Sequence, residues 1–268
     1  MRAIVREVCR SFSVFSCLML HLYLCGMKQI VNIIIPKDWQ ELNDKQLRFV
    51  YRLLGSNYSL PQVKTKCLIK WSGIEVIRRE GALFVVRYNK QVFPISALQI
   101  AEAIQQMDWL GDFPQQPVRL SRIGFHRAVR ADLQNVCFED FIALDNLYQG
   151  FLQTRNEDLL HEMACILYKA RFIKLNQEEA TSIFYWFTSM KRYFANLFTH
   201  FFSKPSDGSG TSLTFAQLQE NMNTQIRALT GGDITKERDV LRMDCWRALT
   251  ELDAKARDYE EMQKHTTK

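Results

Sequence analysis

The sequence predicts a mainly α-helical protein with a small α+β part near its N-terminal end and a helical hairpin at its C-terminal end. Three observations predict this class. Short β-rich runs occur before residue 97, apolar residues at helical spacing fill the chain after residue 130, and Gly231-Gly232 separates two amphipathic stretches. With 268 residues, 47% of them hydrophobic, the chain is long enough to form a substantial core.

Residues 1–26 are predicted to be a leader that stands apart from the fold. They combine a basic start with an apolar run, as a signal peptide does, but they contain no small-x-small cleavage site. The apolar run is also shorter than the roughly 20 residues of a membrane span. A start at Met27 would instead give a strand followed at once by Pro36 and a helix. An over-extended start, a signal or anchor, and a structural segment all remain open.

Residues 27–112 are predicted to form a small α+β domain. Ile30–Ile35 is an apolar, β-branched run typical of a strand, and two amphipathic stretches after it predict helices. Three short β-rich runs follow, and the turn signals Glu80-Gly81 and Asn89-Lys90 between them predict a β-meander. Ser96 then caps a further helix.

Residues 113–203 are predicted to form a helical domain that begins with an irregular, proline-containing segment. Its last helix, over about residues 177–202, carries aromatic residues on nearly every side. Such a helix is typical of either the centre of a core or an interface. Lys191 and Arg192 lie in the middle of this helix, so we do not predict a membrane span in the body of the chain.

Residues 204–212 have the composition of a flexible linker, and residues 213–268 are predicted to form the helical hairpin. Gly231-Gly232 is typical of a helix C-cap and lacks the pattern of a phosphate-binding loop. The hairpin either packs on its own domain or docks a partner helix. Apolar residues recur at steps of 3 and 4 along both helices: Leu218, Met222, Ile226 and Leu229, then Cys245, Leu249, Leu252, Ala256 and Tyr259.

Charge and cysteine content indicate a cytoplasmic protein without a strong demand for anionic partners. The formal net charge of +6 is mild, and the seven cysteines include no C-x-x-C pair. Scattered cysteines in apolar surroundings are typical of reduced core residues, which favours a reducing compartment.

No motif gives positive evidence for an enzyme, a cofactor or a metal site. His161 and Cys165 share one face of a predicted helix with Glu162 between them, as in some zinc sites. However, no second histidine or third ligand follows at a recognisable spacing, and an ordinary helix surface is favoured. Paired acids such as Glu178-Glu179 are typical of solvent-facing helix positions.

Four arginines in residues 118–131 provide the alternative function, nucleic-acid binding. Arginines interleaved with an aromatic residue can contact phosphates and stack on a base. A loop that is solvated, or that forms salt bridges to acidic helices, is the favoured interpretation, so nucleic acid is not the expected partner. The residues of this alternative are Arg119, Arg122, Arg127 and Arg130, with Phe125 and His126 among them.

Several sequence blocks carry a resemblance to a known family: IPKDWQELNDKQLRFVYRLL, ALQIAEAIQQMDWLG, PVRLSRIG, ALDNLYQGFL and MNTQIRALTGGDITKERDVLRMDCWRALTELDAKARDYEE. They are similar to a poorly characterised family encoded in prophage-like gene clusters of gut bacteria, and the similarity covers Met27 to the end. The resemblance implies a role in phage tail assembly, for example as a chaperone that coats the tape-measure protein. It supplies no catalytic or ligand residues.

The sequence therefore predicts a non-enzymatic interaction or assembly protein of a phage or prophage, with a protein partner. We expect truncation after Ser212 to abolish partner binding and to leave a folded remainder. The working surfaces expected on the hairpin and on the aromatic helix consist of Trp246, Leu249, Leu252, Trp186 and Phe194.

Overall fold

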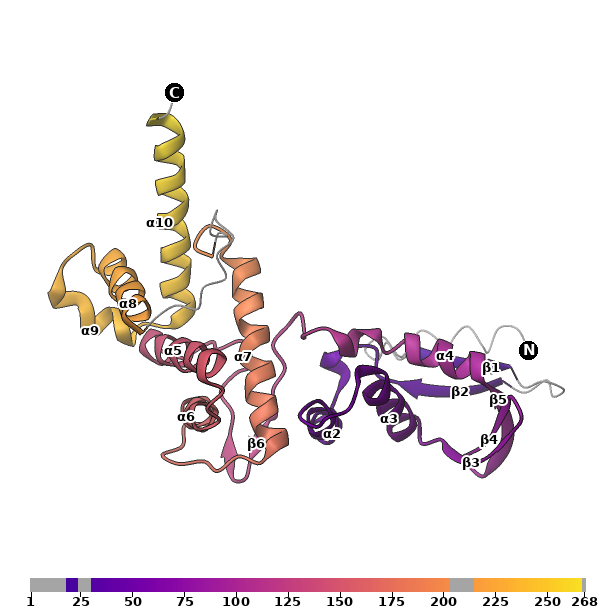
Figure 1. The fold of residues 1–268 in the computed structure, drawn as a ribbon. Helices are drawn as coiled ribbons and strands as arrows, with labels where there is room; N and C mark the ends of the chain where they lie inside the picture. Colours follow the sequence, from indigo (N-terminus) through magenta and orange to yellow (C-terminus); the bar gives the residue numbers. More distant parts are fainter. Residues whose placement is uncertain (1–17, 24–29, 203–214, 267–268) are drawn as a thin grey trace, which may run out of the picture. The chain divides into compact units, whose positions relative to one another are not determined.

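The computed structural model describes residues 18–23, 30–202 and 215–266 (Figure 1). These residues are mainly helical, with a small antiparallel sheet towards the N-terminal end, so the predicted fold class is confirmed. The chain divides into two compact units: unit 1 is Met1–Asp112 and unit 2 is Phe113–Lys268. Among the described residues, no helix combines the length and the apolar character needed to cross a bilayer.

Unit 1 combines two small antiparallel sheets with three α-helices in its described residues. The strands β1 and β2 form a pair, and β3, β4 and β5 form a meander. In chain order the elements are β1 (Leu18–Tyr23), β2 (Ile30–Ile35), η1 (Trp39–Glu41), α2 (Asp44–Leu54), α3 (Leu60–Ser72), β3 (Glu75–Glu80), β4 (Leu83–Tyr88), β5 (Gln91–Ser96), α4 (Ala97–Gln105) and η2 (Asp108–Gly111).

Strand β1 lies inside the segment that the sequence predicted to stand apart from the fold. Its residues pair with all of β2, from Leu18 opposite Ile35 to Tyr23 opposite Ile30, as in the structural segment that was one of the three open alternatives for residues 1–26. The physical reason is that an apolar run next to a lone strand can satisfy the backbone groups of that strand. The rest of the predicted leader, residues 1–17 and 24–26, lies outside the described residues.

Local signals in the sequence explain the limits of the unit 1 elements. The Asn43 side chain accepts hydrogen bonds from the backbone N–H groups of Lys45 and Gln46, and the Asn43 N–H donates to the Gln46 Oε1, which makes a capping box at the start of α2. Asn89 and Lys90 both have positive φ, as the two-residue type I′ turn between β4 and β5 requires.

The core of unit 1 is built around Trp39. Its indole stacks on Tyr51 with ring centroids 5.8 Å apart and meets the edge of Trp109 at 5.5 Å. The Trp39 Nε1–H donates to the carbonyls of Trp109 and Asp112, at 3.2 and 3.0 Å. These bonds hold the end of unit 1 against its own first helices.

Unit 2 is a bundle of helices with one short β-hairpin. In chain order its elements are β6 (Arg122–Ile123), β7 (His126–Arg127), α5 (Phe138–Thr154), α6 (Asp158–Leu167), α7 (Gln177–Leu197), α8 (Phe215–Thr230), η3 (Ile234–Lys236), α9 (Glu237–Arg242) and α10 (Cys245–Thr266).

Helix α7 is the central element of the unit 2 core. Of the two settings that the sequence left open for this aromatic helix, the structure places it in the core. Its side chains Trp186, Phe187, Met190 and Phe194 are at most 1% exposed and pack among residues of α5, α6 and α10. Lys191, in the middle of the helix, forms a 2.8 Å ion pair with Asp145 of α5.

The predicted hairpin belongs to the same compact unit as the predicted helical domain. Cys245, Ala248 and Leu249 are fully buried in the core that α7 centres. The part of the predicted hairpin after Gly232 contains two α-helices, α9 and α10, where one was predicted. The helix is interrupted because Met243 has an extended backbone, with φ of −62° and ψ of 152°. Gly231 and Gly232 end α8 with φ of +65° and +87°, where glycine avoids the strain of a side chain. The predicted linker, 204–212, lies outside the described residues.

Candidate functional site

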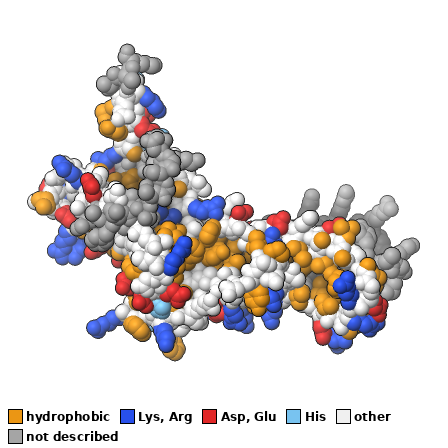
Figure 2. Space-filling view, viewed as in Figure 1, with side chains coloured by type: hydrophobic (Ala, Val, Ile, Leu, Met, Phe, Trp, Pro, Cys, Tyr) orange, Lys and Arg blue, Asp and Glu red, His pale blue; other side chains and the backbone are white. Residues whose placement is uncertain are grey.

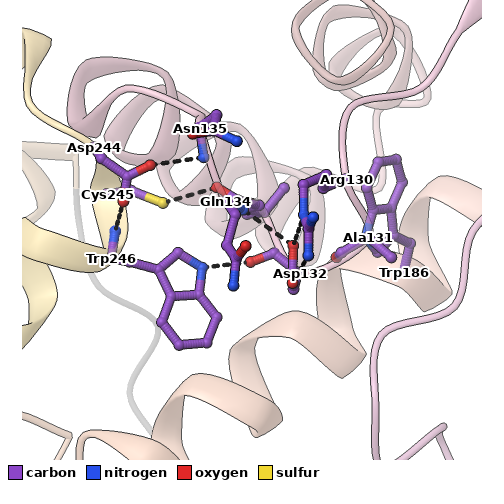
Figure 3. Close-up of polar contacts among 10 residues, drawn as sticks. Arg130, Ala131, Asp132, Gln134, Asn135, Trp186, Asp244, Cys245 and Trp246 are labelled. Atoms are coloured by element: carbon purple, nitrogen blue, oxygen red, sulfur yellow. Dashed lines mark hydrogen bonds and ion pairs between the residues drawn. The ribbon is translucent and has the colours of Figure 1, made fainter.

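The start of α10 is tied to the segment that precedes α5 (Figure 3). The Trp246 Nε1–H donates to the Asp132 carbonyl at 2.7 Å, and the buried Cys245 thiol lies 3.3 Å from the Leu133 carbonyl. The Asp244 carboxylate accepts from the Asn135 N–H at 2.7 Å and from the Trp246 N–H at 3.0 Å. The bonds to Asp132, Leu133 and Asn135 link positions more than 100 residues apart, so α10 is an integral part of unit 2.

The five residues expected to form partner surfaces are mostly inside this core. Trp186, Phe194, Leu249 and Leu252 are between 0 and 4% exposed, so in this conformation they hold unit 2 together and form no accessible surface. Trp246 is half-buried against Phe194, Phe198 and Tyr193. The physical reason is that the helical spacing that suits a partner helix suits the helices of its own unit equally well.

The apolar stripe of α10 continues beyond the core. Along steps of 3 and 4, exposure rises from 4% at Leu252 through the half-buried Ala256 to 59% at Tyr259. Met262, on the adjoining position of the next turn, is 61% exposed. We call Ala256, Tyr259 and Met262 the distal stripe. The helix is held in place beside it, because Asp253 accepts from the N–H groups of His200 and Phe201, both at 2.9 Å.

The arginine-rich segment folds into the hairpin of β6 and β7. Arg122 pairs with Arg127 across the two strands, and Gly124, with φ of +54°, allows the two-residue turn. Phe125 stands at the tip of this turn and is 100% exposed. Arg127 is exposed and forms no ion pair with any described residue, which agrees with the solvated form of the loop that the sequence favoured. The turn presents an aromatic ring between two exposed arginines.

A second basic segment connects α6 to α7. Ile173 and Leu175 point into the core, while Phe172 is 77% exposed. Lys169, Arg171 and Lys174 are exposed and form no ion pair within the described part of the chain. No acidic residue occurs between Met163 and Gln177. This alternation arises because the two buried apolar side chains fix which side of the segment faces water.

The two basic segments lie side by side (Figure 1). The Val129 N–H donates to the Leu167 carbonyl, and the buried Tyr168 hydroxyl donates to the Leu120 carbonyl, both at 2.8 Å. The lower edge of unit 2 in Figure 2 shows Lys and Arg side chains next to hydrophobic ones. We call the combined surface the basic face, which consists of Arg122, Phe125, Arg127, Lys169, Arg171, Phe172 and Lys174.

An open cavity of about 380 Å³ occupies the other end of the arginine-rich segment. Arg130 in its wall is neutralised by Asp132, with Nε–Oδ1 and Nη2–Oδ2 distances of 3.2 and 3.1 Å. The Arg119 Nε is buried and has no hydrogen-bond partner among the described residues. The four predicted arginines are therefore divided between two places, the basic face and this cavity. The cavity is lined by Gln116, Pro117, Arg119, Arg130, Ala131, Asp132 and Tyr193.

The Arg130–Asp132 pair is expected to make the stability of unit 2 depend on pH. Burial raises the pKa of Asp132, but hydrogen bonds from Arg130 and from the Gln134 N–H, with the Arg130 charge, outweigh it and leave the pKa below 3.8. The pair therefore stabilises the fold above about pH 4, and this contribution is lost as the pH falls through the lower folded-state pKa. Asp132→Asn should lower Tm above about pH 4, and the difference should shrink as the pH falls through the folded-state pKa of Asp132. Melting curves over this range test it, and a Tm difference that stays constant with pH would contradict it.

Neither the zinc-like motif at His161 nor the two buried cysteines, Cys67 and Cys245, have the geometry or the reactivity of a chemical site. The His161 Nδ1 lies 3.0 Å from the Glu157 carbonyl one turn earlier in α6. Within the described residues, no group of three or more His, Cys, Asp or Glu side chains is arranged to hold a metal. Burial raises the pKa of the Cys67 and Cys245 thiols to about 12, which makes both poor nucleophiles.

The Glu178-Glu179 pair, predicted to face solvent, is instead buried at the start of α7, at 9 and 8% exposed. Glu179 and Asn176 form a capping box, in which the Glu179 carboxylate accepts from the Asn176 N–H at 3.1 Å. The positive end of the helix dipole favours these carboxylates at this place.

Comparisons with known protein families, curated proteins and solved structures find no match to this chain. The site residues therefore stand on their geometry. Lys169, Arg171, Phe172 and Lys174 were not among the predicted residues, although the acid-free run from Met163 to Gln177 is a signal in the sequence. The contact of this run with the arginine-rich segment could not be predicted, because about 40 residues, including α5 and most of α6, separate the two segments.

Proposed function

We propose that this protein is a non-enzymatic interaction protein that serves the assembly of a phage particle, and that it acts as a tail-assembly chaperone. The resemblance to prophage-encoded proteins provides the biological setting. The observation that supports a binding role is the distal stripe, where the apolar seam of α10 leaves its own core and continues on an exposed surface.

The distal stripe suits one kind of occupant, an amphipathic helix. A seam with steps of 3 and 4 presents apolar side chains along one line, which a second helix can match over successive turns. Two opposite charges, Arg257 and Glu261, lie on the other face of the same turns and are exposed. A long helical tape-measure protein offers many such helices. Its apolar stripes would need cover before assembly, and the distal stripe would provide that cover at one position.

Replacing Tyr259 and Met262 together by serine tests this role. The change removes two large apolar groups, each of which contributes on the order of 1.5–3 kcal/mol when fully buried. We expect the affinity for the partner to fall by at least about tenfold. The measurement is co-purification, after co-expression, with any very long helical protein that a neighbouring gene encodes, followed by titration of the purified pair.

Arg257→Ser with Glu261→Ser is the matched control, because it changes the opposite face of the same turns and leaves the net charge unchanged. We expect this variant to bind as the natural chain does. Equal binding by both double variants would contradict the proposal. Light scattering on the chain alone distinguishes a second copy as the occupant: a dimer that dissociates on the Tyr259 and Met262 changes would show that the stripe serves self-association instead.

A further inference from the structure

The basic face is a second surface of unit 2, apart from the distal stripe. Its two segments come from different parts of the chain, and neither contains an acidic residue. Five cations therefore share one surface with two phenylalanines that are 100% and 77% exposed. Acidic residues flank the second segment on both adjoining helices: Asp158 and Glu162 lie on α6, and Glu178 and Glu179 lie in the first turn of α7.

Hydrogen bonds and buried side chains order the backbone of both segments of the basic face in the absence of a ligand. Three hydrogen bonds hold the arginine-rich segment: the Leu120 carbonyl accepts from Tyr168, the Val129 N–H donates to Leu167, and the Ala131 carbonyl accepts from the Trp186 indole. In the other segment, Ile173 and Leu175 are 4 and 8% exposed and anchor the chain in the core. A surface that is already ordered loses little conformational entropy when it binds.

We propose that the basic face binds single-stranded nucleic acid. Exposed lysines and arginines neutralise phosphates, and an exposed aromatic ring stacks on a base without regard to its identity. Phe125 at the tip of the β6–β7 turn and Phe172 in the α6–α7 connection each offer a ring to an unpaired base. Bases in a duplex are stacked inside the helix and are out of reach of these rings, so the aromatic residues favour a single strand. The cations alone would not distinguish a single strand from a duplex, because both carry phosphates.

Fluorescence anisotropy with labelled 20-nucleotide probes, dT20 and rU20, on the full chain tests this proposal. We expect dT20 to bind, and to bind more tightly than the same sequence in a duplex. For about four neutralised phosphates, the logarithm of the affinity should fall against the logarithm of salt concentration with a slope of about −3. Comparison of dT20 with rU20 shows whether DNA or RNA is preferred, and either preference supports the proposal.

Two kinds of variant separate the contributions. Arg127→Glu with Arg171→Glu should weaken dT20 binding by more than about tenfold and make the salt slope shallower. Phe125→Ala and Phe172→Ala should each weaken binding several-fold and leave the salt slope unchanged, because they remove stacking and no charge. All four side chains are exposed, so melting curves should match that of the natural chain.

Arg238→Glu with Arg242→Glu on α9 is the matched control, because it makes the same change in net charge at exposed positions of unit 2 away from the basic face. Equal weakening by this control would show that only net charge matters and would overturn the proposal. Three other results would also overturn it: no binding of dT20 or rU20 at low salt, no effect of the two phenylalanine changes, or binding to phosphatidylserine vesicles without binding to either oligonucleotide.

Discussion

A chain that ends at Ser212 is expected to lose the folded structure of unit 2. The deleted part supplies the fully buried Cys245, Ala248 and Leu249 to the core, together with Leu252 at 4% exposed. It also removes the Trp246 indole and the Asp244 carboxylate, which bind the segment before α5. Loss of one buried leucine typically costs about 2–5 kcal/mol, and a whole domain has about 5–15 kcal/mol of stability. The loss of free energy of unfolding on removing all these groups is therefore larger than the whole stability of unit 2.

This expectation reverses the one drawn from the sequence, that a truncation after Ser212 leaves a folded remainder. Limited proteolysis followed by mass spectrometry tests it: cleavage in α5, α6 and α7 should become rapid in the truncated chain. A chain that ends at Met262 is the control, because the residues it lacks are exposed or lie outside the described structure. It should resist the protease as the full chain does. Protease resistance of α7 in the Ser212 truncation would contradict the prediction.

Trp186→Ala is expected to cause the largest loss among single substitutions, about 3–5 kcal/mol of the free energy of unfolding of unit 2. The Trp186 side chain is 1% exposed at the centre of α7 and meets the edge of Tyr168 at 6.2 Å. Its Nε1–H donates to the Ala131 carbonyl at 2.7 Å. Removal of the ring leaves a cavity and an unsatisfied carbonyl, and each of these lowers the free energy of unfolding.

Urea unfolding followed by far-UV circular dichroism measures this loss. Trp186→Phe separates the two effects, because it keeps most of the ring volume and removes the hydrogen bond, and we expect it to cost about 1–3 kcal/mol. Phe172→Ala is the control for loss of an aromatic residue at the surface, and its effect should stay within about 0.5 kcal/mol. If Trp186→Ala lowered the free energy of unfolding no more than this control, the conclusion that α7 is the centre of the unit 2 core would be wrong.

Local signals were enough to predict most elements of the fold. The strand Ile30–Ile35, the capping residue Ser96 and the stop at Gly231-Gly232 all depend on a few neighbouring residues. The aromatic helix was also predicted, because its composition is extreme. What these signals could not decide was which surfaces meet, since a 3.6-residue period gives the same stripe to a core helix and to a docking helix.

The candidate sites show the same limit. The sequence identified Arg119, Arg122, Arg127 and Arg130 as one group, whereas the structure places Arg122 and Arg127 on the basic face and Arg119 and Arg130 around a cavity. The α6–α7 connection lies beside the arginine-rich segment because of two hydrogen bonds between positions far apart in the sequence, one from the Val129 N–H to the Leu167 carbonyl and one from the Tyr168 hydroxyl to the Leu120 carbonyl. No periodicity within either segment encodes such a contact.

The fold class and the apolar seam of the last helix could be predicted from the sequence, because capping, turn formation and amphipathic spacing are local effects. Two features appear only in the three-dimensional arrangement: the seam is core as far as Leu252 and exposed at Tyr259, and two acid-free segments form one basic face. Both outcomes depend on long-range packing, in which each buried surface is defined by the partner that covers it.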